Sequence, residues 1–153
     1  MGSPVFVGFQ RILVAYDASP HSEHAVDVAL SMGECMKAKV YILGVIVPPE
    51  PAASRAELNA VLDDTTERYE RSFVPIRDRA RLREIDLETD IVVGHPAEQI
   101  IHRAEIIQAS LIVLGRRSHS VFHRWMLSST SERVLKYAHC PVMVVHRDAE
   151  PRK

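Results

Sequence analysis

Residues that suit an anion are concentrated in one stretch of the chain. Gly115 is followed by Arg116 and Arg117, and hydroxyl residues occupy positions 128–131, with no acidic residue in between. Guanidinium groups match phosphate oxygens, and hydroxyls at a helix N-terminus add to the free backbone N–H groups there. The stretch therefore predicts a phosphate site. The alternative is an ordinary helix cap preceded by two solvated arginines.

A second chemical group is expected near that site. Arg11 to Tyr16 (RILVAY) is a short apolar run of strand-forming residues, and Asp17 follows it directly. A carboxylate at a strand end can bind a ribose or a metal-bound water. It can also form an Asx turn or cap the helix that follows, and the sequence leaves both interpretations open.

The hydrophobic pattern predicts the elements that position these residues. Apolar runs predict strands, and stretches with helical spacing or helix-start signals follow them. The predicted strands are 11–16, 39–47, 87–93, 111–114 and 141–146, and the predicted helices are 20–38, 55–84, a third opening at Pro96, and 129–138. Strands that are apolar throughout and alternate with helices indicate a parallel α/β sheet covered on both faces. Ligands of such sheets bind beyond the carboxyl ends of the strands.

Two local signals set further expectations. Pro75 lies inside the second predicted helix and is expected to kink or break it. Ser129 stands at capping-box spacing from Glu132 and is expected to begin the last helix. His21 and His24 are three residues apart, a spacing that can hold a metal ion on a helix, but surface histidines are the preferred interpretation, so no resident metal site is assigned.

Composition limits the class of protein. The 153 residues suit a single domain, expected at 11–147, with 1–10 as a leader or expression remnant and 148–153 as a tail. A net charge of -1 gives no reason to expect nucleic acid or a membrane as partner. Two cysteines and no apolar run of about 20 residues favour a cytoplasmic location.

The C-terminal part carries a family resemblance. LIVLGRRSHSVFHRWMLSSTSERVLKYAHCPVMVV resembles the C-terminal half of the universal stress proteins. Their motif is Gly, two residues, Gly, nine residues, Gly, then Ser or Thr. It corresponds here to Gly115, Ser118, Ser128 and Ser129. RILVAYDAS and GHPAEQIIHRAE are also similar to family segments, so the resemblance extends over most of the chain.

The resemblance implies a fold, an assembly and a ligand. The fold is a three-layer, Rossmann-like α/β/α domain, like that of the adenine nucleotide alpha hydrolases, with strand order 3-2-1-4-5. The assembly is a homodimer paired through the last strand, Pro141–His146. The ligand is ATP or another adenine nucleotide, with Mg²⁺ only alongside it. The expected binding residues are Asp17, Val45, Gly115, Arg116, Arg117, Ser118, Ser128, Ser129 and Thr130.

The motif departs from the family at two positions. Ser118 and Ser128 stand where the motif has glycine, and a serine held in a left-handed conformation costs on the order of 1 kcal/mol. Two functions therefore stay open: a stress-response module that binds a nucleotide, and one that acts only through protein partners. No catalytic residue is assigned, and any catalysis is expected to be slow ATP hydrolysis or self-phosphorylation.

Overall fold

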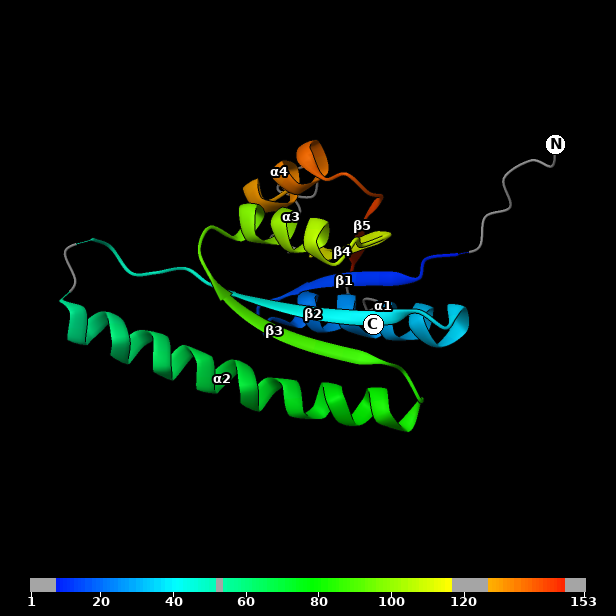
Figure 1. Cartoon of the computed structure of the whole chain (residues 1–153), viewed down its shortest axis with the longest axis horizontal. Coiled ribbons are helices and arrows are strands. Elements are labelled where there is room, and N and C mark those ends of the chain that lie inside the picture. Colours follow the sequence, from blue (N-terminus) through cyan, green and yellow to red (C-terminus); the bar gives the residue numbers. More distant parts are fainter. Residues whose placement is uncertain (1–7, 52–53, 117–126, 148–153) are drawn as a thin grey trace, which may run out of the picture.

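The protein folds around a parallel sheet of five strands in the order β3-β2-β1-β4-β5 (Figure 1), which confirms the predicted fold class. The computed structural model describes residues 8–51, 54–116 and 127–147. The strands are β1 (Arg11–Tyr16), β2 (Lys39–Ile46), β3 (Leu87–Val93), β4 (Leu111–Arg116) and β5 (Val142–His146). The helices are α1 (Pro20–Met36), α2 (Arg55–Leu82), α3 (Pro96–Ile106) and α4 (Ser129–Tyr137).

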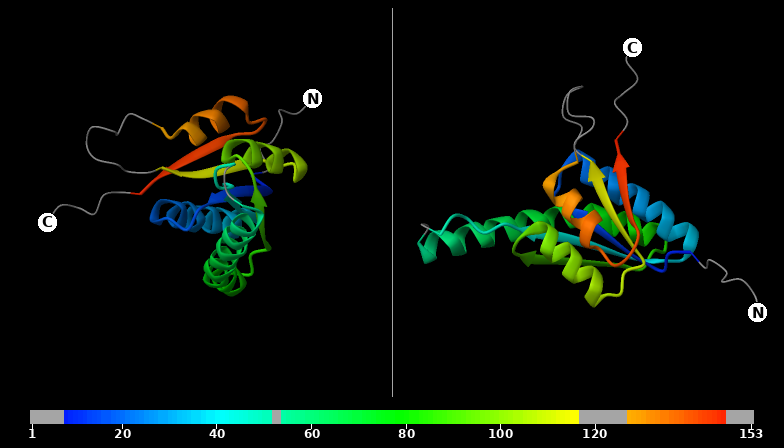
Figure 2. Two further views of the ribbon diagram at one scale, coloured as in Figure 1. Left: turned by 90° about the vertical axis from the view of Figure 1, so that its left-hand side faces the viewer. Right: turned by 90° about the horizontal axis from the view of Figure 1, so that it is seen from above.

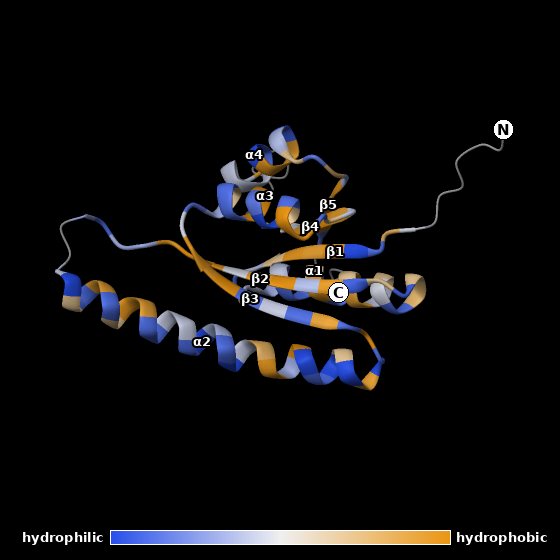
Figure 3. Cartoon of the chain, in the orientation of Figure 1, coloured by the Kyte–Doolittle hydropathy of each residue, from blue (hydrophilic) through white to orange (hydrophobic). Residues whose placement is uncertain are grey.

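Helices cover both faces of the sheet because side chains alternate along each strand. Ile12 and Val14 face α1 and α2 in one hydrophobic cluster, whereas Leu13 belongs to a second cluster with residues of α3 and α4. Figure 2 shows the two pairs of helices on opposite sides of the sheet. In Figure 3 the ribbons of β1 and β2 are largely orange, that is hydrophobic, whereas α2 alternates between hydrophilic and hydrophobic segments. The sheet thus has two separate cores.

Helix α2 runs without interruption through Pro75, so the predicted break is wrong. Pro75 is exposed, and Phe73 and Ile76 beside it are fully buried. Packing of the buried stripe holds the helix together, while water can reach the carbonyl that the proline leaves without a donor. A capping box between Ser54 and Glu57 fixes the start of the helix.

The ends of several elements differ from the prediction by one or two residues. β4 continues to Arg116, two residues beyond the apolar run. α4 starts at Ser129 as expected, but the residue that caps it is Ser128, whose hydroxyl accepts a hydrogen bond from the Ser131 N–H. The cap role predicted for Ser129 is therefore wrong by one position. No helix among the described residues has the length and apolarity to cross a membrane.

Candidate functional site

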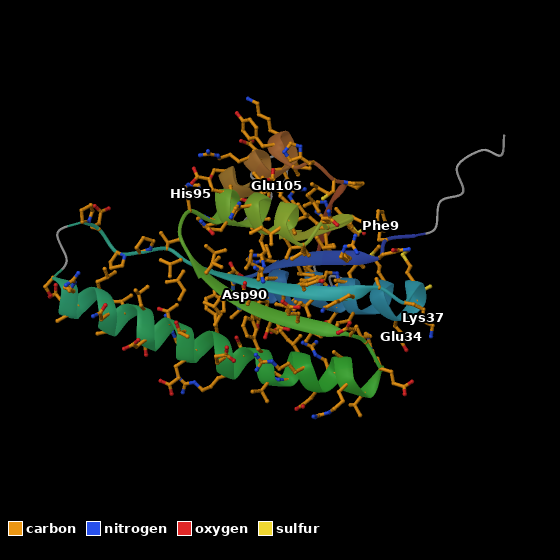
Figure 4. All side chains as sticks on the ribbon, viewed as in Figure 1. Phe9, Glu34, Lys37, Asp90, His95 and Glu105 are labelled. Atoms are coloured by element: carbon orange, nitrogen blue, oxygen red, sulfur yellow. The ribbon has the colours of Figure 1, made fainter. Side chains whose placement is uncertain are left out.

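A cavity of about 420 Å³ opens at the carboxyl ends of β1, β2 and β4. In Figure 4 the carboxyl ends of the strands lie near His95, while Phe9 and Lys37 mark the opposite, amino ends. The apolar residues that line the cavity are Ala15, Leu43, Val45, Val47, Pro96, Ile100 and Leu114. The polar residues that line it are Tyr16, Asp17, His21, Ser22, Tyr69, Ser128, Ser129, Thr130 and Ser131.

The structure brings most of the sequence-predicted residues together. The cavity is lined by Asp17, Val45, Gly115, Ser128, Ser129 and Thr130. Arg116 does not line it; its Nη1 lies 3.3 Å from Nδ1 of His146, because a residue at the end of β4 faces its neighbour on β5. Arg117 and Ser118 lie outside the described residues.

The N-terminus of α1 forms one side of the cavity and holds an internal anion. The Ser19 N–H donates to Asp17 Oδ1 over 3.0 Å, which is an Asx turn, and the Ser19 hydroxyl donates to the same oxygen. His21 Nε2 lies 2.8 Å from the Ser19 hydroxyl and 3.7 Å from Asp17 Oδ2. Asp17 therefore forms the turn and also lines the cavity.

These contacts determine the charge on Asp17. Partial burial raises the pKa of this carboxyl, but hydrogen bonds from Ser19 and Ser22 and the nearby His21 lower it by more. The net effect is a pKa below the ordinary value of 3.8. Asp17 is thus a carboxylate at neutral pH, and the cavity has a fixed negative charge at this side.

The N-terminus of α4 forms the opposite side and has a similar cap. The Ser128 hydroxyl accepts from the Ser131 N–H over 3.1 Å, and the Glu132 N–H donates to the Ser128 carbonyl over 2.9 Å. Within the described part of the chain, the N–H groups of Ser129 and Thr130 have no acceptor. Of the described residues that line the cavity, only Asp17 is acidic.

Ser128 adopts a conformation that does not require glycine. Its φ of -62° and ψ of 155° are extended, and its side chain is the cap of α4. The cost expected for a serine in a left-handed conformation therefore does not arise at this position. The serine instead supplies the hydroxyl that orders the first turn of the helix.

Gly115 lines the cavity at the point where β4 approaches the first turn of α1. A Cβ atom on this residue would lie 2.3 Å from the backbone oxygen of His21 and 3.0 Å from the backbone nitrogen of Ser22. Real contacts are never this close, so only glycine lets β4 approach the first turn of α1. The need for glycine here is therefore one of packing between β4 and α1.

Two aromatic residues of the cavity were not predicted. The Tyr69 hydroxyl, from α2, donates to the Val45 carbonyl over 3.3 Å. The Tyr16 hydroxyl donates to Glu23 over 2.5 Å, and burial together with this acceptor raises the pKa of Tyr16 to about 12. The four-residue spacing between Tyr69 and Phe73 is the signal in the sequence that could have found it, and by itself this spacing indicates only a core position.

The described residues include no group of three side chains suited to hold a metal ion. A divalent ion at this site would have one carboxylate, Asp17, as a protein ligand. Hard cations such as Mg²⁺ keep several waters and bind through one or two carboxylates plus substrate phosphates. The residues present thus fit a Mg²⁺ ion that arrives with a nucleotide.

Comparison with known proteins agrees with this architecture. Residues 8–146 match the Universal stress protein family. A universal stress protein of Methanocaldococcus jannaschii is 32% identical over 143 residues, which cover 91% of this chain and 83% of the relative. A solved structure of a family member from Burkholderia pseudomallei is 28% identical, with a TM-score of 0.75, and covers 93% of this chain and 98% of that one.

Two more distant structures share the fold. One is a universal stress protein in complex with cAMP, 22% identical with a TM-score of 0.69 over 91% of this chain and 98% of that one. The other is an Arabidopsis thaliana family protein with AMP bound, 19% identical with a TM-score of 0.66 over 92% and 94%. The family match spans nearly the whole chain, and with the sheet order and the close relative it leads to one conclusion: the chain belongs to the universal stress protein family.

Proposed function

We propose that this protein is a stress-response regulatory module that binds an adenine nucleotide in the strand-end cavity. The observation that carries the proposal is the polarity of that cavity. One side offers hydrogen-bond acceptors and the other offers donors without acceptors of their own. A nucleotide has the complementary arrangement, with hydroxyl and amino donors at the nucleoside and acceptor oxygens at the phosphate.

The acceptor side suits a nucleoside. The Asp17 carboxylate can accept from ribose hydroxyls, and the second lone pair of the Val45 carbonyl can accept from an exocyclic amine. The apolar lining formed by Leu43 and Ile100 gives the base a dry surface. A volume of about 420 Å³ lies within the range of roughly 300–1,000 Å³ found for small-molecule sites.

The donor side suits a phosphate. The N–H groups of Ser129 and Thr130 point out of the first turn of α4, where the helix dipole adds partial positive charge. Their hydroxyls add further donors. This chemistry accepts a single phosphate as readily as the first phosphate of a longer chain. We propose that any Mg²⁺ is bound only with the nucleotide.

The solved relatives support the choice of ligand, since one was crystallised with cAMP and another with AMP. Both ligands carry adenine and one phosphate group. We further propose a homodimer paired through residues 141–146, because β5 is an edge strand whose outer side has no neighbour in the sheet. A module that acts only through protein partners remains the competing function.

Thermal unfolding of nucleotide-stripped protein tests the proposal. We expect AMP, ADP, ATP or cAMP at a hundredfold excess over its Kd to add about 2.7 kcal/mol of stability and raise the midpoint by several degrees. Sodium chloride at equal ionic strength is the control for unspecific ionic effects. If none of the four nucleotides moves the midpoint, the nucleotide site is refuted and the interaction module stands.

A further inference from the structure

Tyr69 belongs to the cavity although it comes from a different layer of the fold. It lies in the middle of α2, and its ring packs with Tyr16 and Phe73, whose ring centroids are 6.4 and 5.9 Å away. The residue is only 9% exposed, and it lines the cavity next to Val45. Helix α2, which packs on the same face of the sheet as α1, thus contributes a polar group to the cavity.

The position of the ring is matched to Gly44. A Cβ atom on Gly44 would lie 2.9 Å from the Cδ1 and Cε1 atoms of Tyr69, so the ring occupies space that a side chain on β2 would fill. The ring therefore packs close to the backbone of β2 just before the strand ends at Ile46. This close approach puts the hydroxyl within reach of the next peptide group.

The Tyr69 hydroxyl contacts the strand end that faces the ligand. It donates to the Val45 carbonyl over 3.3 Å. Burial raises the pKa of this phenol, and the negative charge of Asp17 raises it further, so the proton stays on the oxygen. A carbonyl oxygen has two lone pairs, and Tyr69 occupies one of them. The other is left for a donor in the cavity.

We propose that Tyr69 is a positioning residue that sets the base specificity of the site by holding the Val45 carbonyl toward the ligand. This inference rests on the proposed nucleotide site. A fixed carbonyl acceptor favours a purine with an amino group at that position, as in adenine. It disfavours a purine with a carbonyl there, because two acceptors would face each other.

The test uses AMP and IMP, which differ at this group and in the proton that IMP carries on the adjacent ring nitrogen, and a third ligand without a base, ribose 5-phosphate. Their affinities are measured by calorimetry for the unmodified protein and for Tyr69→Phe, which keeps the ring and removes the hydroxyl. We expect Tyr69→Phe to weaken AMP binding about tenfold and to reduce the AMP-to-IMP affinity ratio by a similar factor. Ribose 5-phosphate binding should change by less than about twofold.

The outcomes separate this inference from the function on which it rests. An unmodified protein that binds none of the three ligands refutes the nucleotide site itself. An unmodified protein that binds AMP, with an AMP-to-IMP ratio that Tyr69→Phe leaves unchanged, refutes the role of Tyr69 alone. Equal weakening of all three ligands also refutes it, because that pattern indicates only a structural effect.

Two further variants control the experiment. Tyr137→Phe removes a hydroxyl from an exposed tyrosine of α4, outside the cavity, and should change neither the affinities nor their ratio. Gly44→Ala leaves the hydroxyl in place but displaces the ring that carries it. It should lower the AMP-to-IMP ratio in the same direction as Tyr69→Phe, and an unchanged ratio would contradict the proposal.

Discussion

The N-termini of α1 and α4 are built alike but have opposite electrostatic environments. Each has a serine cap, Ser19 or Ser128, that accepts from the N–H of a buried serine three residues later. The cap hydroxyl of each also contacts the hydroxyl of that buried serine, at 3.1 and 3.0 Å. At α1, however, the carboxylate of Asp17 lies against the cap.

The difference shows how one type of helix start can serve two purposes. At α1 the partial positive charge is already balanced by Asp17, so this end presents an acceptor to the cavity. At α4, Glu132 lies in the first turn, but no described carboxylate contacts the cap, so the N–H groups of Ser129 and Thr130 stay available. We call the N-terminus of α1 closed, because Asp17 contacts its cap, and the N-terminus of α4 open, because two of its N–H groups have no described acceptor.

Gly115 lets β4 pack against the first turn of α1, and substituting it should have the largest effect. In Gly115→Ala the new methyl group would meet the His21 backbone at 2.3 Å, so α1 must move away from β4. We expect a loss of unfolding free energy of about 3 kcal/mol, measured by urea unfolding. Nucleotide binding should fall with it, because the cavity loses one wall.

The exposed Cys35→Ala on the same helix is the control, with an expected change within about 0.5 kcal/mol. A loss below about 1 kcal/mol for Gly115→Ala would mean that the helix yields easily, and that the termini do not depend on this contact. Because Gly115→Ala alters the fold, it cannot by itself assign the glycine to the ligand.

Placing a carboxylate at α4 should convert the open terminus into a closed one. Ser129→Asp adds an anion at the first helical position, next to the N–H groups proposed for phosphate. We expect the affinity for AMP to fall at least about tenfold through charge repulsion, while the unliganded protein gains about 0.5 kcal/mol from the helix dipole. Calorimetry and thermal unfolding measure the two effects.

Ser129→Asn is the matched control, because asparagine has the shape of aspartate without its charge. It should retain most of the AMP affinity. Adenosine, which has no phosphate, should bind Ser129→Asp and the unmodified protein equally. If Ser129→Asp binds AMP as tightly as the unmodified protein does, the phosphate does not lie at α4, and the comparison between the two termini loses its functional meaning.

The sequence was sufficient for the fold and for part of the site. Apolar strands between helices predicted the layers, and the position of Asp17 after RILVAY predicted its place at the strand end. These signals are local, and the parallel topology then brings the strand ends to one edge. Pro75 was misjudged because the packing of Phe73 and Ile76 outweighs a local breaking signal.

The remainder of the site depends on contacts between distant residues. Tyr69 reaches the cavity only because Gly44, 25 positions earlier, leaves room for its ring. Arg116 was expected at the cavity on charge alone, but its direction is set by its register with His146. Such pairings cannot be read from one stretch of sequence, and each requires knowledge of which elements lie side by side.

The smallest expected effect concerns the anion at α1 and its dependence on pH. The pKa of Asp17 in the folded protein is below 3.8, so protonation is harder in the folded state than in the unfolded chain. Asp17 therefore contributes stability above pH of about 5, and this contribution is lost as the pH falls through 3.8 toward the folded pKa.

Asp17→Asn lacks this contribution at every pH. Urea unfolding between pH 3 and 7 should show a shallower acid loss for Asp17→Asn than for the unmodified protein. Ser19→Ala, which keeps the carboxylate but removes its hydroxyl donor, should lie between the two, and parallel curves for all three proteins would show that α1 gains nothing from its internal anion.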